Sequence, residues 1–160
     1  MDIQNFDIYL LRFPEDLWEK EEYNMIKYVQ RTPSAEEFNY LTDSVSWGSR
    51  ENLIVEKALK NTLYSLCVYD DNKLIGYGRI IGDETIFLYI QDIMVIPEYQ
   101  NKHIGTGIME NLLKQINIYK KINPNIRTYL GALKGKESFY EKFGFISRPN
   151  ENLGAGMILY

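Results

Sequence analysis

The residues best suited to chemistry lie in a short polar loop between an apolar strand and an amphipathic helix. Loop and helix start read Gln100-Asn101-Lys102-His103-Ile104-Gly105-Thr106-Gly107. The first N–H groups of a helix have no partner within it, and the helix dipole adds a positive field at that end. Glycine also lets the backbone approach a phosphate closely. We therefore predict that these residues cradle a pyrophosphate group.

The strand that leads into this loop, Ile86–Val95, is predicted to lie beside the reacting groups. Alternation puts Tyr89, Gln91 and Ile93 on one face and Asp92 on the other, unless a bulge intervenes. Glutamine cannot act as a base, but it can position a water molecule. Asp92 is interpreted as a structural hydrogen-bond acceptor, so the sequence offers no evident general base.

Length and composition narrow the class of protein. The 160 residues indicate one domain, 1–160, with residues 1–22 as an N-terminal extension of unassigned role. The net charge of −4 gives no reason to expect nucleic acid as a partner. One histidine and one cysteine argue against a metal site, and Cys67 lies in an apolar run typical of a packed thiol. No segment suggests a membrane span or a leader, so we expect a cytoplasmic protein.

The elements that position these residues can be predicted from periodicity and capping. Ser34 and Glu37 form a capping box for a helix that ends near Gly48, and Ser49 is expected to cap a second helix running to about Lys60. The remaining strands and helices follow from alternation, turn residues and helical apolar stripes. They comprise strands over 25–30, 63–69, 73–81, 86–95, 126–130, 145–147 and 156–160, and helices over 105–119 and up to 143.

This order predicts an α+β domain. Its central sheet is mixed and mostly antiparallel, with about six to seven strands and about four flanking helices. The strand–helix–strand passage from 86 to 130 implies one parallel pair.

Three motifs in the expected order resemble those of the GNAT superfamily of acyl-CoA-dependent N-acetyltransferases. They are Leu74-Ile75-Gly76-Tyr77-Gly78-Arg79, the strand and loop from Asp92 to Gly107, and Phe139-Tyr140-Glu141-Lys142-Phe143-Gly144-Phe145. The second resembles the family's pyrophosphate motif, [Q/R]-x-x-G-x-[G/A], with Gln100 first and Gly105 last. The resemblance covers roughly residues 25–160 and implies acetyl-CoA as the co-substrate.

By this resemblance, backbone N–H groups from Asn101 through Gly107 bind the pyrophosphate of coenzyme A. His103 departs from the pattern, since the family usually has glycine there. A histidine fits without strain if the local backbone is helical. Lys102 is open to two interpretations, a point charge for a phosphate or a solvated loop lysine.

The resemblance also implies a split between the two parallel strands, opened by a bulge, in which the pantetheine arm lies. The N–H and C=O groups of Ile93 and Val95 would bind that arm, and an N–H near Met94 would polarise the thioester carbonyl. Tyr140 matches the tyrosine that protonates the departing thiolate. Tyr89 and Gln91 lie on the strand face that borders the acceptor site in the family.

The sequence therefore predicts transfer of an acetyl group to a primary amine by direct attack, with a small-molecule amine as the expected acceptor. Two alternatives stay open: acetylation of a protein N-terminus or lysine, and a non-catalytic acyl-CoA-binding sensor. A homodimer is among the assemblies that the sequence allows.

Overall fold

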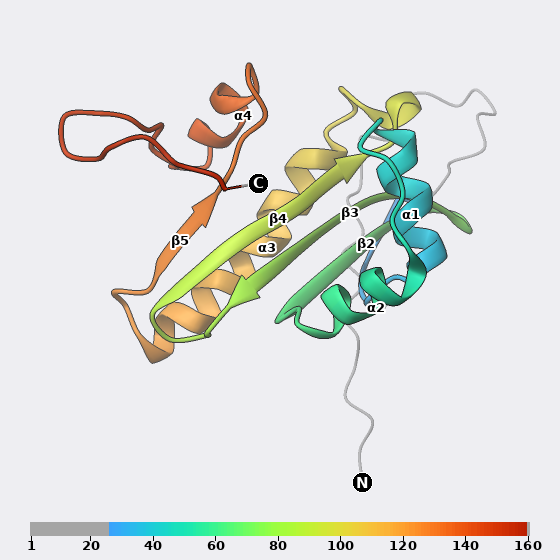
Figure 1. Ribbon diagram of the computed structural model, residues 1–160, viewed down its shortest axis with the longest axis horizontal. Helices are drawn as coiled ribbons and strands as arrows, with labels where there is room; N and C mark the ends of the chain where they lie inside the picture. Colours follow the sequence, from blue (N-terminus) through green and yellow to red (C-terminus); the bar gives the residue numbers. More distant parts are fainter. Residues whose placement is uncertain (1–25, 160) are drawn as a thin grey trace, which may run out of the picture.

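The computed structural model describes residues 26–159 and forms one mixed sheet flanked by helices (Figure 1). The strands run in the order β1-β2-β3-β4-β5, with β4 and β5 parallel and the other pairs antiparallel. The elements are β1 (Ile26–Gln30), α1 (Ala35–Ser44), α2 (Asn52–Lys60), β2 (Tyr64–Asp70), β3 (Lys73–Gly82), β4 (Phe87–Val95), the 3₁₀ turn η1 (Pro97–Tyr99), α3 (Ile104–Ile122), β5 (Arg127–Leu130) and α4 (Glu137–Glu141).

The prediction of about six to seven strands was wrong for the described part of the chain, which has five. Residues 145–147 and 156–159, both predicted as strands, form none. Phe145 instead packs its ring against Tyr140, with centroids 6.4 Å apart, and residues 146–159 are all exposed. A strand pattern needs a partner strand to hold it. The extension over 1–22 lies outside the described residues.

A side-chain cap marks the start of α1 as predicted, but the cap predicted for α2 does not form. The Ser34 hydroxyl accepts from the N–H of Glu37, 3.2 Å away, and the Glu37 carboxylate accepts from the N–H of Ser34, as the predicted capping box requires. Ser49 does not cap α2, because its hydroxyl donates to Asp43. The N-cap of α2 is Glu51, whose side chain makes no capping bond.

The helices form two layers, with α1 and α2 on one face of the sheet and α3 on the other (Figure 1). Phe38 of α1 meets Tyr77 of β3 edge to face, with ring centroids 5.9 Å apart. The opposite face of β3 presents Gly76 and Gly78 to α3, whose Ile108 is fully buried. The core therefore runs on both sides of β3, so this strand and its neighbour β4 form the rigid centre of the fold.

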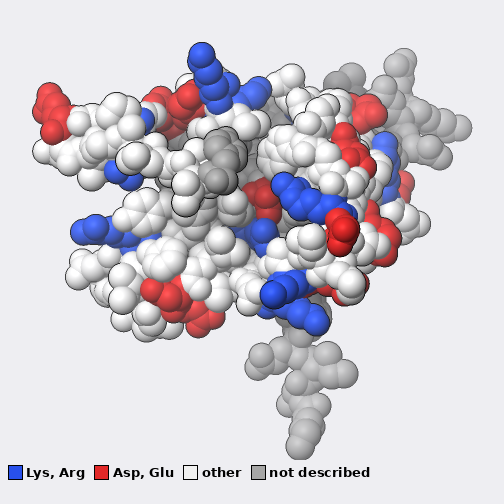
Figure 2. All heavy atoms as spheres, in the orientation of Figure 1, with Lys and Arg blue, Asp and Glu red and all other residues white. Residues whose placement is uncertain are grey.

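The surface carries charges of both signs. Figure 2 shows Lys and Arg interspersed with Asp and Glu over the visible face, without a large area of one sign. No helix within residues 26–159 is long and apolar enough to cross a membrane.

Candidate functional site

A bulge interrupts β4 at the point where the sequence suggested one. Tyr77 pairs with Met94 and Arg79 pairs with Gln91, so β4 holds one more residue than β3 between these two pairs. Asp92 takes the left-handed conformation, with φ of 55°. Gly78 faces the bulge, where a Cβ would lie 2.7 Å from Cδ1 of Ile93. Glycine fits there because two side chains pack over the position: Ile93 of the bulge, and Ile108 of α3, whose Cγ2 would lie 2.6 Å from the Cβ.

The bulge changes which β4 side chains share a face. Strict alternation predicted Ile93 on the face of Tyr89 and Gln91, and Asp92 on the other. In the structure Asp92 bonds Arg79, the cross-strand neighbour of Gln91, whereas Ile93 turns toward Gly78 and α3. That assignment was predicted only for a strand without a bulge, and the extra residue reverses it for Asp92 and Ile93. Tyr89 and Gln91 stay on the face that α1 and α2 cover.

β4 and β5 separate just before the bulge. Their pairing ends at Ile90 and Leu130, although β4 continues to Val95. β5 itself ends at Leu130, and Figure 1 shows the chain that follows it leading away from β4 toward α4. No other described strand takes the vacated side of residues 91–95.

The free backbone groups of β4 can be assigned from the ladder. The N–H of Ile96 donates to the carbonyl of Ile75 in β3, 2.9 Å away. Because antiparallel bonding alternates, the polar groups of Val95 and Ile93 face away from β3, into the split. The same alternation turns the N–H of Met94 toward β3. The structure therefore places the backbone N–H and C=O groups of Ile93 and Val95 at the split, on the side of β4 away from β3. It does not place the N–H of Met94 there.

The predicted cradle is a chain of unbonded N–H groups. Asn101 and His103 are both left-handed, with φ of 60° and 61°, while Lys102 between them is not. Such alternation turns successive N–H groups toward one point, a geometry that binds anions. None of the N–H groups of residues 101–106 donates to another described residue. The N–H of Gly107 donates to the carbonyl of His103, 3.0 Å away, and so is not free.

His103 does not have the helical backbone under which it would fit without strain. It lies at the N-cap of α3 in the conformation that favours glycine, and histidine is among the side chains that adopt it more readily than most. The imidazole of His103 is exposed.

Two polar side chains of the loop contact residues that lie just before it in the sequence. The amide Nε2 of Gln100 donates to the carbonyl of Val95, 2.9 Å away, one of the groups predicted to bind pantetheine. The ammonium of Lys102 lies 5.2 Å from the ring centroid of Tyr99, a cation–π contact. Lys102 is exposed, which leaves its charge accessible.

The glycines of α3 pack against aromatic rings. A Cβ at Gly105 would lie 3.4 Å from the ring of Phe139 and 4.0 Å from Val95, so the final helix, the cradle and the split meet at Gly105. A Cβ at Gly107 would lie 2.2 Å from the hydroxyl of Tyr28, which also donates to the carbonyl of Ile104 at 3.4 Å. The ring of Tyr28 thus fills the space that a side chain at position 107 would need.

This contact predicts opposite effects for two alanine substitutions in one helix. Gly107→Ala should lower the free energy of unfolding by about 1–3 kcal/mol, since it overpacks against Tyr28. Gly105→Ala makes only ordinary contacts and removes a flexible residue, so it should be neutral or stabilising. Urea denaturation measures both, and adding Tyr28→Leu to Gly107→Ala should recover most of the loss. A Gly107→Ala loss that Tyr28→Leu leaves unchanged would contradict this packing.

Tyr140 lies on the short α4, which follows β5. It is half-buried between Phe139 and Phe145, with ring centroids 5.0 and 6.4 Å away. Burial raises the pKa of Tyr140 above its ordinary value, because the phenolate loses hydration. Its hydroxyl bonds to no other described residue, so the phenol is protonated and available as a donor.

Asp92 forms an ion pair with Arg79. The guanidinium Nε lies 2.6 Å from the carboxylate, and the two side chains are 12% and 16% exposed. Arg79 also donates to the carbonyl of Ala58 and the hydroxyl of Thr62, both at 3.1 Å. This confirms Asp92 as a structural acceptor. The pair joins the bulge to the end of α2.

Sequence reasoning missed the residues that support the site from other strands. Tyr28 gave no signal, because its contact with Gly107 joins positions distant in sequence. Gly78 and Arg79 belong to the hairpin motif noted above, but their roles opposite the bulge depend on the β3–β4 register.

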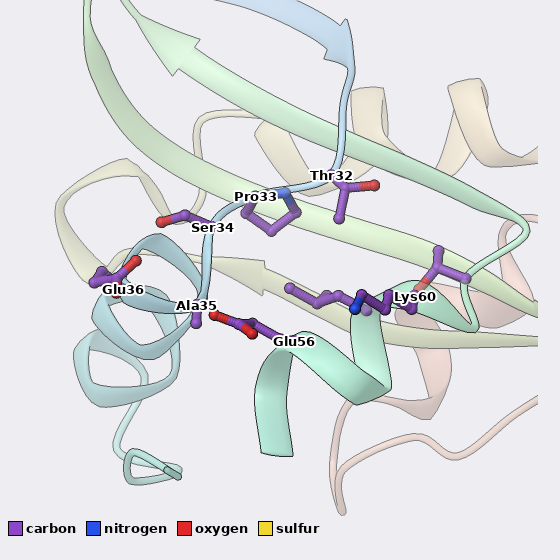
Figure 3. Close-up of a pocket in the computed structure, with 9 residues that line it drawn as sticks. Thr32, Pro33, Ser34, Ala35, Glu36, Glu56 and Lys60 are labelled. Carbon is purple, nitrogen blue, oxygen red and sulfur yellow. The ribbon is translucent and has the colours of Figure 1, made fainter. Parts of the chain in front are cut away.

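A shallow pocket elsewhere is separate from these residues. Figure 3 shows it between the β1–α1 connection and α2, with Glu36, Glu56 and Lys60 at its rim. It shares no lining residue with the split or the cradle.

Comparisons with known proteins agree with this geometry. The acetyltransferase (GNAT) domain family matches residues 62–147. A ycf52-like N-acetyltransferase from Prochlorococcus marinus is 32% identical, over 82% of this chain and 73% of its own length. A probable acetyltransferase of unknown function from methicillin-resistant Staphylococcus aureus superposes with a TM-score of 0.73 at 31% identity, over 85% of this chain and 100% of that one.

A third comparison shows the fold alone. A GNAT family acetyltransferase from Brucella melitensis, solved in complex with acetyl-CoA, gives a TM-score of 0.58 at 22% identity, over 78% of this chain and 85% of that one. Together with the family match over more than half of the sequence, these likenesses establish that the chain is a member of the GNAT superfamily of N-acetyltransferases.

Proposed function

We propose that this acetyltransferase transfers the acetyl group of acetyl-CoA to a primary amine. The observation that carries the proposal is the separation of β4 from β5 at a bulge, next to a row of unbonded N–H groups. The N–H groups of residues 101–106 suit a diphosphate. The backbone groups of Ile93 and Val95 face away from β3 and suit the amides of a pantetheine arm, provided that the Val95 carbonyl accepts a second bond or releases the one from Gln100. The acetyl-CoA complex of the Brucella melitensis relative supports the same donor here.

The reaction follows from this placement. The amine nitrogen attacks the thioester carbonyl carbon, the carbon–sulfur bond breaks, and Tyr140 donates its phenolic proton to the departing thiolate. The carbonyl oxygen would accept from a free β4 N–H, Ile93 or Val95 rather than Met94. Asp92 is held by Arg79, so water ordered near Tyr89 and Gln91 takes the proton that the amine loses.

Binding and turnover test the proposal separately. Acetyl-CoA should bind the full chain in calorimetry, and Gly105→Val should weaken that binding about tenfold or more, because its methyl groups would fill the space between cradle and split. Glu110→Val puts the same residue at an exposed position of α3 and should leave binding unchanged. Equal loss in both variants, or no binding by the parent chain, would refute the cradle.

Release of free CoA thiol then identifies the acceptor. Turnover with small primary amines supports the proposal, whereas turnover only with peptides would make a protein N-terminus or lysine the acceptor. Tight binding of acetyl-CoA without release on any amine or peptide would leave the chain a sensor.

A further inference from the structure

The shallow pocket between the β1–α1 connection and α2 lies at the opposite end of the sheet from the cradle (Figure 3). β2 and β4 run in the same direction, since both are antiparallel to β3. The cradle follows the end of β4, whereas the pocket lies where β2 begins. Ala35 and Leu59, which are 4% and 5% exposed, give the pocket an apolar side. Its volume of about 430 Å³ is in the range of small-molecule sites.

Opposite charges on the rim of this pocket are not paired with each other. Glu56 and Lys60 lie one turn apart on α2, the spacing at which such side chains commonly pair. Neither of the two ion pairs formed within residues 26–159 includes them. In Figure 3 the carboxylate of Glu56 points instead toward Ala35. Glu36 adds a second carboxylate, so two negative charges and one positive charge surround the opening.

One residue of the pocket connects it to the bulge in β4. Thr62 lines the pocket, and its hydroxyl oxygen accepts from Nη1 of Arg79, 3.1 Å away. Nε of the same guanidinium lies 2.6 Å from the carboxylate of Asp92 in the bulge. A hydroxyl that accepts one bond can still donate its own O–H, and this one donates to no other described residue. A ligand that accepts from Thr62 makes its oxygen a stronger acceptor for Arg79, because linked hydrogen bonds polarise one another.

We propose that this pocket binds an α-amino acid with a cationic side chain, and that its binding strengthens the binding of acetyl-CoA. The ligand's carboxylate accepts from Lys60 and Thr62, and its two cationic groups pair with Glu56 and Glu36. One turn of helix spans about 5.4 Å, so a molecule whose charges are a few bonds apart can reach both Glu56 and Lys60. The net negative rim favours such a ligand over a neutral amino acid. The site itself does not depend on acetyl transfer, whereas its effect on acetyl-CoA rests on the proposed function.

Calorimetry of the full chain with L-lysine, without acetyl-CoA, tests the site. L-Lysine should bind with a Kd of about 1 mM or tighter, and L-norleucine, which lacks the second ammonium, should bind about tenfold more weakly. Lys60→Met and Glu56→Gln should each weaken L-lysine binding about tenfold or more. Lys57→Met, at an exposed position of α2 outside the pocket, should leave it unchanged. No binding of L-lysine, equal affinity for L-norleucine, or equal effects of all three substitutions would overturn the proposal.

The link to the bulge is measured with coenzyme A in place of acetyl-CoA, so that no acetyl transfer occurs. Saturating L-lysine should tighten the binding of coenzyme A about fivefold, and coenzyme A should tighten L-lysine by the same factor, because such coupling is reciprocal. Thr62→Val, which keeps the shape and removes the hydroxyl, should abolish the coupling. An unchanged or weakened affinity for coenzyme A would overturn the link. A chain that does not bind coenzyme A would refute the proposed function and the link, while the L-lysine titration still decides the site.

Discussion

Tyr140→Phe should lower kcat about one-hundredfold or more, the usual contribution of a positioned general acid, while the Kd for acetyl-CoA changes little. The phenylalanine ring keeps the contacts with Phe139 and Phe145 and removes only the proton donor. Stopped-flow release of CoA thiol measures turnover, and calorimetry measures affinity. The control is Tyr64→Phe, because Tyr64 is also half-buried with a pKa raised by burial but lies in β2.

The raised pKa of Tyr140 also predicts the direction in which activity changes with pH. The pKa of Tyr140 is raised, so the phenol keeps its proton at every pH below its ordinary value of 10.0. The contribution of this proton to turnover should persist there and be lost as the pH rises through the raised pKa, whereas protonation of the acceptor amine limits turnover at low pH. Tyr140→Phe should lower the profile and remove that alkaline decline. An unchanged kcat with weakened binding of acetyl-CoA would instead assign Tyr140 to binding.

Asp92→Ala should cost about 2–4 kcal/mol of unfolding free energy, because it leaves the largely buried guanidinium of Arg79 without its carboxylate. Part of any loss would come from placing alanine in the left-handed conformation, so the control must share that backbone. Asp71→Ala does: Asp71 has φ of 50° and is exposed in the β2–β3 turn. The excess loss at position 92 over position 71, measured by urea denaturation, isolates the ion pair.

Because Arg79 holds the bulge, the same substitution should also weaken acetyl-CoA binding. A straightened β4 would return Ile93 to regular alternation and close the split. Equal losses at positions 92 and 71, with unchanged binding, would show that the pair does not support the bulge.

Local signals predicted most of the fold. The capping box of Ser34 and Glu37 acts within one helical turn, so its residues suffice to predict it. The strands over 156–159 and 145–147 failed because alternation describes a strand's faces and does not supply a neighbour. The loop before α3 was predicted from its glycines and the helix start. The left-handed backbone of His103 was not, because histidine adopts that conformation more readily than most side chains but does not require it.

The faces that Asp92 and Ile93 take in β4 depend on tertiary structure. Whether Asp92 shares a side with Gln91 depends on the extra residue, and the extra residue depends on Gly78 and Arg79 in the neighbouring strand. The sequence of β4 alone therefore does not show which face Asp92 takes. The role of Asp92 as a structural hydrogen-bond acceptor was nevertheless predicted, whereas its ion pair with Arg79 was not.

The contact of Tyr28 with Gly107 makes the two borders of the sheet unequal. On one border, β1 is pinned by a ring wedged against the first turn of α3 and bonded to Ile104. It therefore cannot fray without loosening the helix start that presents the unbonded amides. Opening of β1 should therefore loosen the first turn of α3 as well, although β1 and that turn lie far apart in the sequence.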